Sequence, residues 1–344
     1  MAVIDFIKNV DQLEDVMTTP SPAFIETLVQ TPGDILILGV SGKMGPTLAR
    51  LAKRAITQAG AKKRVIGVAR FSNAAAREEL HKSGIETIAC DLLNPRDIQQ
   101  LPDVENIMYM IGMKFGSTGR EAETWAINAY IPAVVTQKFK NSRIVLFSTG
   151  NVYPLTPVKL GGSKESDATG PIGEYAQSAL ARERIFEYFC RAQQTPGVIL
   201  RLNYAIDLRY GVLLDVAQKV FHGQTIDLSM GHANVIWQGD ANAMALRCFG
   251  LTQTPPLVLN LTGPETVSIR RLAESFGALL DKSPKLTGEE SETALLSNAG
   301  RCFELLGYPT ITLEQMIQWV AHWVKIAGPT LAKPTHFETR TGKF

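Results

Sequence analysis

The sequence has little of what a metal enzyme or a disulfide-stabilised protein needs. Its 344 residues include four scattered cysteines, at positions 90, 190, 248 and 302, and no C-x-x-C pair. A disulfide framework is therefore not expected, and the cysteines are predicted to be buried reduced thiols. The five histidines form no H-x-x-x-H motif and have no clustered carboxylates beside them, so no metal site is predicted.

Long apolar runs and a strong charge of either sign are also missing. The plain apolar runs, such as residues 35–38, are far shorter than the ~20 residues that span a bilayer. The 35 basic and 33 acidic residues leave a net charge of +2, so neither nucleic acid nor a membrane is expected as a partner. Residues 1–5 lack the basic segment and apolar stretch of a secretory signal, which makes a cytoplasmic location the default expectation.

From residue 34 onward, strand-like and helical segments alternate. The Val-, Ile- and Leu-rich runs predict strands at 35–38, 64–69, 85–90, 106–111, 143–148 and 198–202. Helical segments are predicted between them at 46–59, 74–83, 95–101, 121–139 and 174–193, with a loop at 154–173. This alternation predicts an α/β fold, a Rossmann-type doubly wound parallel sheet with helices on both faces. Continuous apolar strands are what a sheet buried on both sides requires.

The segment between the first strand and the first long helix is rich in glycine. In that setting glycines permit a tight turn and a close approach of the backbone to a pyrophosphate, which the helix N-terminus then attracts. The segment predicts a dinucleotide-binding turn; a simple glycine-rich turn is the alternative. The residues that would hold the cofactor here are Gly39, Ser41, Gly42, Lys43, Met44 and Gly45.

Four units follow along the chain. Residues 1–33, with helices at 3–17 and 23–30, are predicted to be a helical appendage packed on the main domain; a mobile linker is the alternative. Residues 34–206 form the dinucleotide-binding domain, and residues 207–328 form a small, mostly helical substrate-binding cap with strands that return to the sheet. Residues 329–344 contain two prolines and no apolar periodicity, so they are predicted to trail over the surface.

The end of the second strand bears on the choice of cofactor. An NAD site usually has an acidic side chain there for the ribose hydroxyls. This chain has Arg70 instead, and a guanidinium can pair with a 2′-phosphate through two hydrogen bonds. NADP is therefore favoured over NAD, with a solvated turn arginine as the alternative.

These residues resemble the short-chain dehydrogenase/reductase superfamily, in its extended branch of NAD(P)-dependent epimerases and dehydratases. The resemblance covers roughly residues 34–325 and includes the spacing of a Y-x-x-S-K-x-x-x-E signature at Tyr175, Ser178 and Glu183. It implies that Asp91 and Leu92 contact the adenine and that Asn128 is a structural asparagine. It also implies that Ile111, Gly112, Met113 and Lys114 line the nicotinamide side.

The same resemblance implies how the chemistry would be divided. Tyr175 would be the acid/base beside the nicotinamide, and Thr149, or less favourably Ser148, would bind the substrate oxygen. The family's lysine would bind the nicotinamide ribose and lower the tyrosine pKa, but residue 179 is alanine. Without a neighbouring cation, a phenol of pKa ~10 is only about 0.1% ionised at pH 7.

Three interpretations of this departure remain open. Another cation, with Lys114 the best candidate, could take the place of the lysine; the reaction could need little base strength; or the protein could bind cofactor without turnover, as a sensor. Family members that use sugar nucleotides usually carry an arginine in the strand that corresponds to residues 233–237, and none stands there. A sugar or sugar acid is therefore favoured over a nucleotide sugar. The family often dimerises through the helices at 121–139 and 174–193, and their apolar content is compatible with a homodimer.

Overall fold

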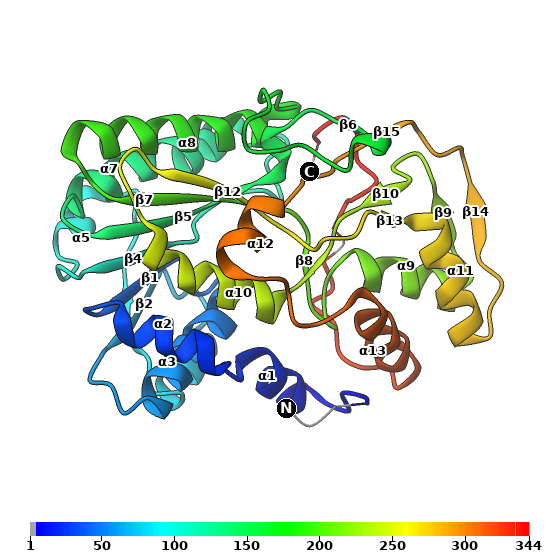
Figure 1. Ribbon diagram of the computed structural model, residues 1–344, viewed down its shortest axis with the longest axis horizontal. Coiled ribbons are helices and arrows are strands. Elements are labelled where there is room, and N and C mark those ends of the chain that lie inside the picture. Colours follow the sequence, from blue (N-terminus) through cyan, green and yellow to red (C-terminus); the bar gives the residue numbers. More distant parts are fainter. Residues whose placement is uncertain (1–4, 334, 344) are drawn as a thin grey trace.

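The computed structural model describes residues 5–333 and 335–343. Its centre is a seven-stranded sheet in the order β12-β7-β5-β4-β1-β2-β3, with every neighbouring pair parallel (Figure 1). The strands are β1 (Ile35–Leu38), β2 (Val65–Ala69), β3 (Glu86–Ala89), β4 (Asn106–Tyr109), β5 (Arg143–Thr149), β7 (Gly197–Leu202) and β12 (Leu257–Leu261). The predicted doubly wound sheet is confirmed, with strand ends shifted by at most two residues.

The sheet is covered on both faces, which is why its strands are apolar throughout. Along β1, Ile35 and Ile37 belong to the core on one face, and Leu36 and Leu38 belong to the core on the other. One face carries α3 (Gly45–Gln58), α10 (Gln238–Arg247) and α12 (Gly300–Leu306); the other carries α5 (Pro95–Gln99), α7 (Ile131–Lys138) and α8 (Gly173–Gln193). Helix α4 (Ala74–Lys82) lies beside β3 at the sheet edge.

The segment predicted as one helix over 121–139 contains an irregular turn. It is divided into α6 (Glu121–Trp125), a π-helical turn η1 (Ala126–Tyr130) and α7. Pro132 has no N–H to donate to the carbonyl of Asn128 four residues earlier, so the regular α-helical ladder is interrupted there. The freed carbonyl accepts a hydrogen bond from Arg182 Nε on α8 at 3.4 Å.

A second core lies beyond the carboxyl edge of the sheet. Helices α9 (Val212–Phe221), α11 (Ile269–Leu280) and α13 (Leu313–Lys325) surround it. Short paired strands also occur in and beside the cap. The sequence pattern predicted one of them, at residues 235–237, but not the others, because runs of two or three residues show no period. These pairs are β9 (Thr225–Asp227) with β14 (Lys285–Thr287), and β10 (His232–Ala233) with β13 (Val267–Ser268). Two further pairs are β11 (Ile236–Trp237) with β8 (Ala205–Ile206), and β15 (Thr293–Ala294) with β6 (Thr156–Pro157); β6 and the 3₁₀ turn η3 (Val158–Leu160) lie within the predicted loop 154–173.

The N-terminal helices α1 (Val10–Thr18) and α2 (Pro22–Gln30) pack on the rest of the molecule. Leu13 and Met17 of α1 enter the core of the cap, and Leu28 of α2 enters the core on one face of the sheet. The first helix was predicted to start at residue 3, but it starts at Val10 after Asn9, whose side chain accepts from the N–H of Gln12. Residues 3 and 4 of that prediction lie outside the described residues.

The prediction that residues 329–344 trail over the surface is wrong for their second half. Phe337 is 1% exposed and belongs to the cap core. Both the N–H and the hydroxyl of Thr335 donate to the Asp215 carboxylate, at 2.9 and 2.6 Å. Arg340 donates to the carbonyls of Ser229 and Thr293, and Figure 1 shows this red segment running between the sheet and the cap. Single anchoring side chains in an extended segment leave no periodic signal in the sequence.

Three further facts bear on function. All four cysteines are buried and free. Within the described parts of the chain, no helix has the length and apolar character that crossing a membrane would require. The same residues contain no group of three or more His, Cys, Asp or Glu side chains that could hold a metal ion.

Candidate functional site

The glycine-rich turn joins β1 to α3 as a tight loop. Gly39 has a φ of +86°, and its N–H donates to the Val68 carbonyl at 2.8 Å. A Cβ on Gly45 would overlap the backbone of Val40, so both positions require glycine. Helix α3 then begins after Met44, whose thioether side chain cannot cap the first N–H groups. Few of those groups stay available for an anion such as a pyrophosphate, because the Gly45 N–H donates to the Gly42 carbonyl at 3.2 Å and Pro46 has no N–H.

A cavity of about 560 Å³ opens beside this turn, at the carboxyl ends of β1 to β4. This is where the strand order reverses between β1 and β4, the usual place for a nucleotide in such a sheet. The lining includes most of the predicted cofactor residues: Gly39, Ser41, Gly42, Arg70, Asp91, Leu92, Ile111, Gly112, Met113 and Lys114. Lys43, Met44, Gly45, Asn128 and Tyr175 are outside that lining.

The cavity suits a dinucleotide in size and chemistry. A Cβ on Gly42 would meet only the Gly39 carbonyl, at 3.2 Å, so this glycine leaves its side open for a phosphate. Arg70 is exposed at the end of β2 and lines the cavity. The Asp91 carboxylate accepts from the N–H of Leu93 at 3.0 Å, which orients it at the end of β3. Lining residues that were not predicted include Phe115, Arg120 and Glu123.

Lys43 points away from the nucleotide cavity. Its Nζ donates to the Ala205 carbonyl at 2.7 Å and lies 4.1 Å from the centre of the Tyr210 ring. Burial lowers the pKa of this amine to about 8, and the nearby Asp207 carboxylate opposes the shift. The side chain therefore joins the glycine-rich turn to the cap, while only its backbone remains beside the turn.

Tyr175 lies in the first turn of α8 and is 8% exposed. A side-chain hydrogen bond joins it to Thr149 at the end of β5. Burial raises the phenol pKa, whereas Arg182 and the Thr149 hydrogen bond act in the opposite direction. The structure therefore brings together the predicted acid/base residue and the predicted substrate-binding hydroxyl.

Ser148, the other predicted hydroxyl, is engaged elsewhere. It donates to the Glu183 carboxylate at 2.5 Å, and that carboxylate also pairs with Arg201. Arg201 donates in turn to the Tyr153 hydroxyl at 2.7 Å. All of these groups are buried, so the network fixes the end of β5 against α8 and leaves Thr149 as the hydroxyl nearest the phenol.

Lys114 lies on the side of Tyr175 that faces the cap. Its Nζ is 5.8 Å from the centre of the Tyr175 ring and 5.9 Å from that of Tyr204. Burial lowers the pKa of this lysine to about 8. The amine thus lies near the Tyr175 ring, and its burial disfavours the charged form.

Asn128 and Arg182 fill the opposite side, toward the sheet. The Asn128 side chain accepts from the Met113 N–H at 2.9 Å and donates to the Met113 carbonyl and to the Ser178 hydroxyl. Arg182 donates to the Asn128 side chain at 2.5 Å and to the Phe147 carbonyl at 3.0 Å. These bonds fix the loop after β4, α8 and the end of β5 relative to one another.

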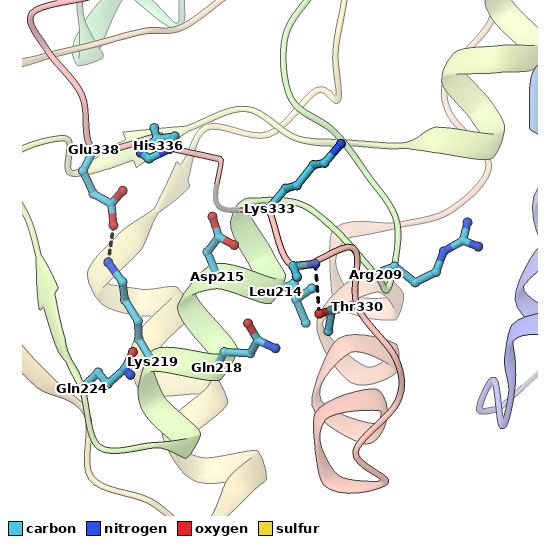
Figure 2. A pocket seen from close by; sticks show the side chains of 11 residues that line it. Arg209, Leu214, Asp215, Gln218, Lys219, Gln224, Thr330, Lys333, His336 and Glu338 are labelled. Carbon is cyan, nitrogen blue, oxygen red and sulfur yellow. Dashed lines mark hydrogen bonds and ion pairs between the residues drawn. The ribbon is translucent and has the colours of Figure 1, made fainter. Parts of the chain in front are cut away.

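The C-terminal segment passes over the cap side of this region. The His336 ring lies 6.1 Å from the Phe115 ring, and Gly342 packs against Gly173, two residues before Tyr175. Figure 2 shows the outer face of this segment, where it forms a cavity of about 400 Å³ with α9 and Lys219 pairs with Glu338. The cavity is lined by Arg209, Leu214, Asp215, Gln218, Lys219, Gln224, Thr330, Ala332, Lys333, His336 and Glu338.

Three residues near Tyr175 were missed from the sequence: Arg182, Tyr204 and Tyr210. Both tyrosines follow β7, at the same carboxyl edge of the sheet as the predicted residues. Their place after a strand could have identified them as candidates for the site. Arg182 stands two helical turns after Tyr175, a spacing that places both on one face of α8. Arg209 lines the cavity of Figure 2 and pairs with Glu14 and Asp207.

Solved structures with the same fold include several that act on sugars. A UDP-glucose 4-epimerase from Thermotoga maritima, determined with UDP-glucose, superposes with a TM-score of 0.69 and 16% identity over 86% of this chain and 99% of that one. A UDP-glucuronic acid 4-epimerase from Bacillus cereus in complex with NAD gives 0.69 and 17% over 85% and 98%. Pal from Bacillus thuringiensis gives 0.70 and 17% over 85% and 99%. At these identities the likeness concerns the fold alone.

No curated protein matches the sequence. Residues 35–206, half of the chain, match the model of the NAD dependent epimerase/dehydratase family. The matched part runs from β1 to β8 and contains the glycine-rich turn, the nucleotide cavity, Thr149 and Tyr175. The chain therefore belongs to the NAD dependent epimerase/dehydratase family.

Proposed function

We propose that this protein is an NAD(P)-dependent oxidoreductase or epimerase that acts on an alcohol or ketone of a carbohydrate-like substrate. The observation that carries the proposal is the hydrogen-bonded pair of Tyr175 and Thr149, next to the segment that lines the nicotinamide side of the cavity. A bound nicotinamide would exchange the hydride with the carbinol carbon. The chain itself must then move one proton to or from the substrate oxygen.

Tyr175 is the group placed to move that proton. In the oxidative direction the substrate hydroxyl gives its proton to the phenolate as the hydride leaves the carbon; in the reductive direction the phenol returns it. Thr149 hydrogen-bonds the same oxygen and orients it. Lys114 stabilises the ionised phenol from the cap side, at the distance given above.

A sugar or sugar acid fits the cap better than a sugar nucleotide. The segment 233–237 offers no arginine for a diphosphate, and residues 335–343 run between the sheet and the cap. The UDP-glucose and UDP-glucuronic acid epimerases named above support a carbohydrate-like substrate in general.

Cofactor binding without turnover is the second candidate. Ala179 in place of the lysine and the raised pKa of the buried Tyr175 favour it. In that case the protein would respond to the nicotinamide pool, and its cap would serve regulation.

NADP is the proposed cofactor because Arg70 lines the cavity at the end of β2.

A homodimer through α6, η1 and α8 is proposed as well, since Trp125, Tyr130 and Tyr188 of these elements are 37%, 47% and 65% exposed. Light scattering should give the mass of two chains, and Tyr188→Arg should reduce it to one. A single-chain mass for the unaltered protein would contradict the dimer.

Tyr175→Phe should reduce turnover on a panel of sugars, polyols and sugar acids by about 100-fold or more, because it removes the proton-transfer group. Binding of NADPH, followed by its fluorescence, should be retained. Tyr188→Phe is the matched control, since Tyr188 is exposed on the same helix. If NADPH binds but neither the unaltered protein nor the variant turns over any compound of the panel, the non-catalytic candidate is favoured.

Arg70→Ala should weaken NADPH binding by roughly 10-fold or more and leave NADH binding nearly unchanged. A charge-assisted hydrogen bond to a phosphate contributes about 1.5–3 kcal/mol. Arg77→Ala is the control, because Arg77 donates to Thr87 and is not part of the cavity lining. Calorimetric titration with both cofactors gives the answer, and an equal loss for both would remove the assignment of NADP.

Lys114→Met should increase the free energy of unfolding at pH 7, by about 2 kcal/mol. Burial lowers the pKa of Lys114 to about 8 in the folded chain, so the unfolded chain binds more protons between pH 8 and the ordinary lysine range. The cost of burying the charge is fully present below pH 8 and disappears as the pH rises above about 10. Urea titrations at pH 7 and pH 10 should show a shrinking difference, and the exposed Lys62→Met should show none. A variant that is less stable than the parent at pH 7 would contradict this electrostatic cost.

A further inference from the structure

We propose that Arg182 supplies the positive charge that the missing lysine at position 179 would have placed beside Tyr175. The inference rests on the proposed role of Tyr175 as acid/base and names the residue that supports it. Arg182 acts through Tyr175, from the sheet side of α8, and its contacts and position carry the argument.

The helix geometry places Arg182 on the same face of α8 as Tyr175. Seven residues turn an α-helix through about 700°, or almost two full turns, so Tyr175 and Arg182 stand on the same face. Long helical side chains lean back over the residues three and four positions earlier, which here are Ala179 and Ser178. Ala179 is fully buried against Val152 and Tyr153 and ends at its Cβ, so no longer side chain at 179 competes with the guanidinium.

The hydrogen bonds of Arg182 show where its guanidinium lies. Its Nη2 donates to the side chain of Asn128, which also accepts from the Met113 N–H and donates to the Ser178 hydroxyl. Ser178 stands three residues after Tyr175 and donates back to the Tyr175 carbonyl at 2.9 Å. The guanidinium therefore lies beside the Asn128 side chain, which bonds Ser178 one helical turn after Tyr175, although the Cα of Arg182 is two turns away.

The guanidinium of Arg182 is bound by neutral acceptors and not by a carboxylate among the described residues. Its three hydrogen bonds go to the carbonyl of Phe147 and to the backbone and side-chain oxygens of Asn128, all of them neutral. One of these acceptors is available because Pro132 cannot donate to it. The contrast is Arg201, whose charge is paired with Glu183.

The segment after β4 is shaped around this guanidinium. A Cβ on Gly112 would lie 2.7 Å from Arg182 Nη2, a separation that packed atoms do not tolerate. Gly112 does not have a left-handed φ, and a larger residue here would displace the end of the Arg182 side chain. Arg182 thus contacts the same stretch that lines the nicotinamide side of the cavity.

The other charged or titratable groups that face Tyr175 cannot serve over the same pH range. Lys114 faces it from the loop after β4, but the pKa of Lys114 is lowered to about 8. Tyr210 faces it from the cap, and burial raises the pKa of that phenol too. An arginine stays protonated throughout the pH range in which proteins fold. Arg182 opposes the burial-driven rise in the pKa of Tyr175 at every such pH.

The test follows the ionisation of residue 175 directly. A 3,5-difluorotyrosine is placed at position 175 of the full chain, where its ring fluorines lower the phenol pKa into the range of stable folding, and its titration is followed by ¹⁹F NMR. Arg182→Met should raise the midpoint by about one pH unit or more, the usual effect of a cation near an acid. Arg182→Lys should stay close to the parent, and Ala179→Lys with Arg182→Met should restore the midpoint. Arg184→Met, an exposed arginine of the same helix, should leave it unchanged.

Several outcomes would overturn the inference. A folded Arg182→Met protein with the parent midpoint would show that Arg182 only holds the packing. If Arg182→Met does not fold, the double variant decides, because a folded double variant with a raised midpoint is incompatible with interchangeable charges at 179 and 182. A shifted midpoint in a protein without turnover would support the role of Arg182 while contradicting the proposed enzyme, so the two failures are distinguishable.

Discussion

The site is held together at the side chain of Asn128. Its amide closes two hydrogen bonds with Met113, a third with Ser178 and a fourth with Arg182. Buried amide and guanidinium groups are stable only when their donors and acceptors are satisfied. The loop after β4, the start of α8 and the end of β5 are therefore fixed as one unit. The nucleotide cavity and Tyr175 keep their relative positions because of this unit.

On the side of Tyr175 that faces the cap, buried charged groups lie among aromatic rings. Lys43, Lys114 and three tyrosines meet there, and the cost of burying two amines appears as lowered pKa values for both lysines. Groups that cost stability are retained most readily where they serve a ligand. The C-terminal segment closes this side through Phe337 and the bonds of Thr335 to Asp215. Amines and aromatic rings therefore surround Tyr175 on this side, and the proposal of a small polar substrate rests on that chemistry.

The sheet could be predicted from the sequence because strands buried on both faces leave continuous apolar runs, such as residues 35–38. The glycine-rich turn could be predicted because backbone conformation and close approach restrict the residue types there. The strands of the cap could not, since pairs such as β9 and β14 have three residues each. The anchoring of Thr335 and Phe337 depends on distant residues and has no periodic trace. Lys114 was considered because the carboxyl ends of neighbouring strands meet at one edge, and the same reasoning would have reached Tyr204.

Arg182 shows why a missing motif residue is weak support for a missing function. What a phenol requires is a nearby positive potential, and that requirement does not prescribe the residue or the position from which it comes. The spacing of Tyr175 and Arg182 was visible in the sequence. The position of the Arg182 guanidinium also depends on two other residues. Pro132 leaves the Asn128 carbonyl free to accept from it, and Gly112 leaves room for it. Pro132 and Gly112 lie far apart in the chain, and together they decide where the guanidinium of Arg182 can lie.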